Sequence, residues 1–125
     1  MRSLIFALLA LLTTPAQAQS DWIFLDETRS GMKFYLRSGS IHEVAGAKRA
    51  WLLINLPKPD KDGVLSVIYL KELRCETKQS RAIQESWFKG PMGSGEARVV
   101  RGEDSWLYAV PGSVDESIMV LVCGR

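Results

Sequence analysis

Two cysteines, Cys75 and Cys123, carry the most reactive side chains of this sequence, and the chain contains no third. A thiol can act as a nucleophile, bind a metal ion or form one half of a disulfide. The chain begins with an export segment, described next, so these thiols are expected in an oxidising compartment, where a lone pair normally closes. The sequence therefore predicts one internal disulfide between Cys75 and Cys123.

Residues 1–18 have the three parts of a cleaved signal peptide. Arg2 supplies a positive charge, residues 4–12 form an apolar run too short to span a bilayer, and the Ala-Gln-Ala triplet at 16–18 suits signal peptidase. We therefore expect a mature chain, residues 19–125, that folds as one domain and is periplasmic or secreted. No cysteine lies near the cleavage site, so no lipid anchor is expected.

Other residues that could do chemistry are sparse. His42 is the only histidine, and no serine or cysteine stands near it at a spacing typical of a catalytic set. One histidine and two distant cysteines do not make a zinc site. Asp115 and Glu116 are adjacent, so their side chains would point in different directions on a helix. The sequence thus favours a non-enzymatic chain without metal or cofactor.

Two segments with glycine and proline are expected to be connections. The Gly-Ser-Gly triplet at 93–95 lacks the flanking residues of a nucleophile elbow or a phosphate loop. Residues 57–63 contain two prolines and an Asp-Gly pair, which predicts an exposed, mobile loop. This loop has too few oxygen ligands for a calcium site. Four of its charged residues are candidates for a binding loop: Lys58, Asp60, Lys61 and Asp62.

Short β-favouring runs alternate with turn residues through most of the mature chain, which predicts an antiparallel sheet of about six strands. In residues 64–75, alternate positions are apolar with Lys71 as the exception, and Cys75 falls on the apolar side. The runs expected to form strands are residues 22–25, 33–37, 41–44, 50–56, 64–75, 80–89, 96–101 and 106–110.

The end of the chain carries a helix signal. Ser113 is suited to an N-cap, and Glu116 stands three residues later, where its side chain can return the hydrogen bond in a capping box. A final strand is the alternative, because residues 118–122 are rich in β-branched side chains. The start signal favours the helix, which we expect the disulfide from Cys123 to Cys75 to tie to the sheet. The fold class is then α+β.

Charge and hydropathy exclude two classes of partner. The chain has 16 Lys and Arg residues against 14 Asp and Glu residues, for a formal net charge of +2. Nucleic-acid binding requires concentrated positive charge, so it is not expected here. No second apolar stretch reaches membrane length, so no integral membrane segment is expected after processing.

Aromatic residues offer a weaker clue. The four tryptophans each fall in an expected strand, where they are expected to pack in the core or cover the sheet. A recognition hot spot is the alternative use of such a side chain. These residues are Trp22, Trp51, Trp87 and Trp106.

An ordered series of residues runs through nearly the whole mature chain. It consists of Trp22, Phe34-Tyr35-Leu36, Ser40-Ile41, Trp51, Ser66, Cys75, Arg81, Met92-Gly93, Gly95, Trp106, Pro111-Gly112-Ser113 and Cys123. With this series the chain resembles the surface-adhesin E family of exported bacterial proteins. The resemblance implies a curved antiparallel sheet with a C-terminal helix tethered to it by the disulfide. It also implies a dimer with a non-enzymatic role in adhesion, binding host matrix or serum proteins.

The sequence as a whole favours an exported binding module that engages a host matrix, serum or envelope protein. A periplasmic enzyme inhibitor or a small periplasmic enzyme is one alternative. A structural envelope component is another, in which an exposed strand edge pairs with a second copy to form a homodimer.

Overall fold

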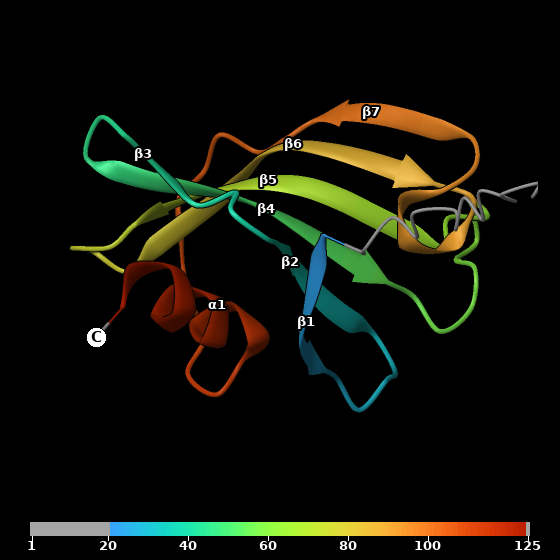
Figure 1. Cartoon of the computed structure of the whole chain (residues 1–125), viewed down its shortest axis with the longest axis horizontal. Helices are drawn as coiled ribbons and strands as arrows, with labels where there is room; N and C mark the ends of the chain where they lie inside the picture. Colours follow the sequence, from blue (N-terminus) through green and yellow to red (C-terminus); the bar gives the residue numbers. More distant parts are fainter. Residues whose placement is uncertain (1–20, 125) are drawn as a thin grey trace, which may run out of the picture.

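The computed structural model describes residues 21–124 as an antiparallel β-sheet with one α-helix against it (Figure 1). The expected signal peptide, residues 1–18, lies outside the described residues. The strands are β1 (Trp22–Glu27), β2 (Lys33–Arg37), β3 (His42–Val44), β4 (Ala47–Asn55), β5 (Ser66–Arg74), β6 (Gln79–Phe88), β7 (Ala97–Arg101) and β8 (Leu107–Tyr108). A short 3-10 helix, η1 (Pro91–Gly93), precedes β7, and α1 spans Val114–Cys123.

The strand order confirms the predicted antiparallel sheet. Six strands form the main path β1-β2-β4-β5-β6-β7, in which every neighbouring pair is antiparallel. Two short strands lie off this path, because β3 pairs with β4 and β8 pairs with β6. The expected first hairpin is also present as β1 and β2, and the C-terminal element is a helix rather than a final strand.

The hydrophobic core lies between α1 and one face of the sheet. Alternate residues of β2, β4 and β5 point towards the helix, as the two-residue period of a strand requires. Figure 1 shows α1 beneath one end of the long strands, so the other end of this face extends beyond the helix. The buried residues of the core are Phe34, Leu36, Ala50, Leu52, Tyr69, Leu73, Ile118, Met119 and Val122.

Lys71, the polar exception in the apolar set of β5, has a partner on the helix. Its Nζ donates to Asp115 Oδ1 at 2.5 Å, and the lysine side chain is only 8% exposed. Such a buried ammonium group needs a partner, since a charge removed from water without one is costly. Asp115 belongs to the first turn of α1, so the ion pair attaches the start of the helix to the sheet.

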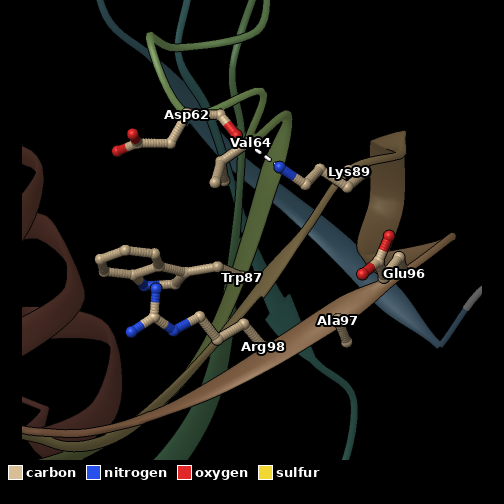
Figure 2. A pocket seen from close by; sticks show the side chains of 7 residues that line it. All are labelled: Asp62, Val64, Trp87, Lys89, Glu96, Ala97 and Arg98. Atoms are coloured by element: carbon tan, nitrogen blue, oxygen red, sulfur yellow. Dashed lines mark hydrogen bonds between the residues drawn. The ribbon is translucent and has the colours of Figure 1, made fainter.

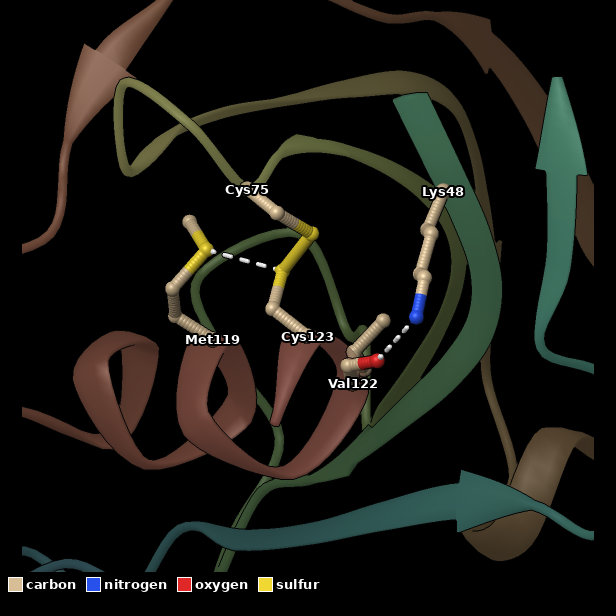
Figure 3. Close-up of a disulfide and its surroundings, with 5 residues drawn as sticks. All are labelled: Lys48, Cys75, Met119, Val122 and Cys123. Atoms are coloured by element: carbon tan, nitrogen blue, oxygen red, sulfur yellow. Dashed lines mark hydrogen bonds between the residues drawn. A yellow bond between two sulfur atoms is a disulfide. The ribbon is translucent and has the colours of Figure 1, made fainter. Parts of the chain in front are cut away.

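The predicted disulfide attaches the other end of the helix. Cys75 follows the last residue of β5, Cys123 is the last residue of α1, and their Cα atoms are 5.5 Å apart. Around the bridge, Lys48 Nζ donates to the Val122 carbonyl at 3.3 Å, and Met119 Sδ lies 3.4 Å from Cys123 Sγ (Figure 3). The lysine thus supplies a positive charge where the helix dipole ends in partial negative charge.

The N-terminus of α1 is capped, with one difference from the expected capping box. Ser113 is the N-cap, and its Oγ accepts the Glu116 backbone N–H at 3.3 Å. The Glu116 carboxylate reaches back, but it accepts the backbone N–H of Gly112 at 3.4 Å. The N–H of Ser113 is already used, because it donates to the Val110 carbonyl. The return bond therefore falls one residue earlier than in the standard box.

The face of the sheet opposite α1 is closed at one end by η1. The Ser66 hydroxyl is buried, donates to the Gly90 carbonyl at 2.7 Å and accepts the Gly93 N–H at 2.9 Å. Gly93 has a φ of 71°, and a Cβ on it would lie 2.5 Å from Ile68 Cδ1. The positive φ therefore favours glycine there, and a larger residue would also push the end of the Ile68 side chain aside.

A row of charged side chains crosses the same face, opposite α1. Glu72 accepts hydrogen bonds from Arg49 Nε at 2.8 Å and from Arg81 Nη2 at 2.8 Å. Arg74 and Arg81 also stack on Trp106, with guanidinium carbons 3.8 Å and 4.5 Å from the ring centroid. Burial alone would raise the pKa of Glu72, but the hydrogen bonds from both arginines outweigh it and hold this pKa below its ordinary value of 4.5.

Removing the disulfide should destabilise the domain strongly. The bridge joins residues separated by 48 positions, so the Cys75→Ala/Cys123→Ala variant should lose about 4 kcal/mol of unfolding free energy on the loop-entropy model. Urea unfolding followed by tryptophan fluorescence measures this loss. Reduction of the wild-type protein is the matched control and should give a similar loss. A loss of less than about 1 kcal/mol would contradict the tethering role of the bridge.

Glu72 should contribute stability that depends on pH. Its folded pKa is depressed, so its contribution is complete above the ordinary value of 4.5 and is lost as the pH falls through the folded value. The difference in unfolding free energy between wild type and Glu72→Gln should therefore be constant near neutrality and shrink in acid. Urea titrations across this range test it, with the exposed Glu76→Gln as control. A difference that stays constant into acid would refute the assignment.

Candidate functional site

The residues that could have formed a catalytic set are separated in the structure. His42 lies on β3, exposed, with its Nδ1 2.9 Å from the Ser40 carbonyl oxygen. Both cysteines are in the disulfide. Within residues 21–124, no three His, Cys, Asp or Glu side chains gather closely enough to hold a metal ion.

The expected binding loop is built around Asp60. Its Oδ1 accepts the backbone N–H groups of Asp62 and Val64, both at 2.9 Å, and its own N–H donates to the Val64 carbonyl. Asp60 therefore holds the turn in shape. Lys58 and Lys61 are exposed. Of the four candidate residues, Asp62 is the one that lines a groove, as described next.

The first groove, which we call the Trp87 groove, lies between this loop and strands β6 and β7 (Figure 2). It has a volume of about 340 Å³. In the β6–β7 ladder Trp87 and Arg98 are direct cross-strand partners, and Figure 2 shows the guanidinium group beside the indole. The residues that line the groove are Asp62, Val64, Trp87, Lys89, Glu96, Ala97 and Arg98.

Polar contacts hold the parts of the Trp87 groove in place. Trp87 Nε1 donates to Glu85 Oε2 at 3.0 Å, which fixes the tilt of the indole. Lys89 Nζ donates to the Asp62 carbonyl and ties the loop to β6. An aromatic surface held in one orientation and flanked by an arginine is typical of protein recognition sites, because little side-chain entropy is lost on binding.

A second groove, the Tyr69 groove, lies on the helix side of the sheet beside the first turn of α1. It has a volume of about 450 Å³, and Val67 on its floor is the cross-strand partner of Trp87. Apolar side chains form most of its wall, with a few polar groups among them. The lining residues are Thr28, Phe34, Ile54, Val67, Tyr69, Lys71, Ala82, Glu85, Val110, Ser113, Val114 and Asp115.

The electrostatics of the Tyr69 groove are unusual at the tyrosine. Burial, together with the nearby negative charges of Asp115 and Glu85, raises the pKa of Tyr69 well above its ordinary value of 10.0. The phenol therefore stays protonated at any physiological pH. The same two carboxylates make this part of the groove a region of negative potential.

Sequence reasoning missed most of the residues that line the two grooves. All four tryptophans are half-buried. Trp87 therefore covers part of the sheet, and it also leaves part of its indole exposed, as a recognition residue would. The sequence did not identify Arg98 or Tyr69 as a groove residue, because the pairing of the strands decides which residues line a groove. The alternation in β5 and β7 gives the face of each residue, but only the pairing of β6 with both neighbours brings them to the grooves.

Comparison with known proteins identifies the fold. The family model of surface-adhesin protein E matches residues 22–124, and no curated protein matches. Crystal form II of Haemophilus influenzae protein E superposes with a TM-score of 0.65 at 18% identity, covering 87% of this chain and 91% of that one. The selenomethionine form of the same protein gives 0.63 at 16% identity, covering 91% and 94%.

These comparisons agree with the topology described above. At such low identity, the structural likeness establishes the fold alone. The family match covers nearly all of the described residues and includes both cysteines and the helix that they tether. This chain therefore belongs to the surface-adhesin protein E family.

Proposed function

We propose that this chain is an exported, non-enzymatic binding protein that uses the Trp87 groove to contact a protein partner. The observation that carries the proposal is the half-buried indole of Trp87, held by Glu85 and flanked by Arg98 in an open groove. The description of the family as a surface adhesin supports the same kind of activity. Host matrix and serum proteins are the partner class that this membership favours.

The scaffold suits such a role. The groove is built from two paired strands and a loop that Lys89 and Asp60 hold in place. Little of this surface must be ordered when a partner binds, so most of the contact energy can appear as affinity. The mixed charges at its rim, from Asp62, Glu96 and Arg98, would favour one register of the partner over others.

The proposal includes export with cleavage after residue 18. The mature domain, residues 19–125, would then be periplasmic or secreted without a lipid anchor. The helix found in residues 21–124 is neither long nor apolar enough to cross a membrane. The oxidising compartment implied by export supports closure of the Cys75–Cys123 bridge.

Reversing the charge of Arg98 should weaken binding. Mature protein is tested by biolayer interferometry against a panel of purified extracellular matrix and serum proteins. For any protein that binds saturably, Arg98→Glu should raise the dissociation constant about tenfold or more, as expected for a hot-spot residue. Arg101→Glu is the matched control, because it lies on the same strand three residues away and therefore on the other face.

Two outcomes would count against the proposal. One is the absence of saturable binding to every protein of the panel. The other is an equal loss for Arg98→Glu and Arg101→Glu, which would indicate a general charge effect. Thermal unfolding of both variants shows whether each retains the fold, and Trp87→Phe, which keeps an aromatic ring, provides a second test at the same site.

A further inference from the structure

We infer that the Tyr69 groove holds a cationic side chain, arginine or lysine, presented by a protein partner. This inference rests on the proposed function, since it names the chemistry of the residue that the partner would insert. It concerns a different part of the surface from the Trp87 groove, although the two grooves adjoin where Val67 pairs with Trp87.

The hydroxyl group of Tyr69 is available to a partner in the groove. The residue is 7% exposed and lines the groove, and its hydroxyl makes no hydrogen bond to any of the described residues 21–124. The hydroxyl oxygen itself reaches solvent, since no enclosed side-chain oxygen or nitrogen in that part of the chain lacks a partner. The hydroxyl is therefore free to accept a hydrogen bond from a donor that enters the groove. A charged donor from a partner would replace the solvent there and form a stronger hydrogen bond than a neutral donor does.

The charge of the groove favours a cation. The groove contains two carboxylates, Glu85 and Asp115, and one ammonium group, Lys71. Lys71 donates to one oxygen of Asp115, and Trp87 Nε1 donates to one oxygen of Glu85. Among the described residues, the second oxygen of each carboxylate has no hydrogen-bond partner. The formal charge of the groove is therefore negative, and a cation is the complementary occupant.

The wall of the groove also suits an arginine or lysine side chain in shape and polarity. Phe34, Ile54 and Val67 line the groove with apolar surface, and Val110 and Val114 line it from the helix side. Arginine and lysine carry aliphatic stems that pack on such surfaces while the charged group reaches a polar end. A volume of about 450 Å³ is ample for one such side chain. An acidic side chain would meet the same wall but would be repelled by Glu85 and Asp115.

Short capped peptides test the inference directly. The ¹⁵N-labelled mature protein is titrated with acetyl-Gly-Arg-Gly-amide, and with the norleucine and glutamate peptides of the same form. The arginine peptide should cause saturable shifts in the Trp87 indole N–H and in the backbone amides of residues 67–71 and 110–115. The norleucine peptide has the apolar stem without the charge and should bind at least about fivefold more weakly.

Variants separate binding from folding. Tyr69→Phe removes only the hydroxyl, which has no partner among the described residues, so it should leave stability nearly unchanged while it weakens arginine-peptide binding about threefold or more. Glu85→Gln keeps an acceptor for Trp87 but removes a charge, and it should weaken binding similarly. Glu103→Gln, exposed and outside both grooves, is the matched control. A structural role for the hydroxyl would instead lower the stability of Tyr69→Phe.

The inference is overturned if the arginine peptide causes no saturable shift at the groove, or if the norleucine peptide binds equally well. It is also overturned if Tyr69→Phe and Glu85→Gln bind the arginine peptide as tightly as wild type. Failure of the proposed function looks different, because the peptide would then bind while no matrix or serum protein is captured. Capture of a protein without any effect of the peptide would remove this inference alone.

Discussion

Two attachments fix α1 to the sheet, and the rest of the surface depends on them. The Lys71–Asp115 ion pair holds the first turn, and the Cys75–Cys123 disulfide holds the last residue. A helix of 10 residues is marginal in water by itself, so its position and its existence both rely on tertiary contacts. Because the helix is short and anchored at one end of the sheet, it leaves part of that face open. Both grooves lie on this uncovered part.

Most of the residues that carry the family resemblance serve the scaffold. Ser66 and Gly93 close one end of the face opposite α1. Arg81 joins Glu72 to Trp106, and Ser113 caps α1. The groove residues Trp87, Arg98, Tyr69 and Glu85 do not belong to that series. The family assignment therefore describes the platform, while the proposed binding residues are side chains that the platform presents. This division is common, since one fold can support many functions through the sites built on it.

Much of the fold could be predicted from the sequence, because local signals and the global structure agree. Strand alternation placed Cys75 near the apolar face, and the start signal at Ser113 distinguished a helix from a final strand. The role of Lys71 could not be predicted, since its partner Asp115 is far away in the chain. The grooves were also missed, because they depend on which residues of β5, β6 and β7 stand opposite one another. Register is a long-range property that alternation within one strand does not specify.

Residue-resolved hydrogen exchange of the mature protein, before and after reduction of the disulfide, tests the central claim most directly. If the bridge and the ion pair together hold α1, reduction should remove protection from the helix amides of residues 118–123 while those of β4 and β5 remain protected, because the helix then opens as a separate unit. Helix amides that stay as protected after reduction as before would contradict the claim, since packing alone would then hold α1 in place.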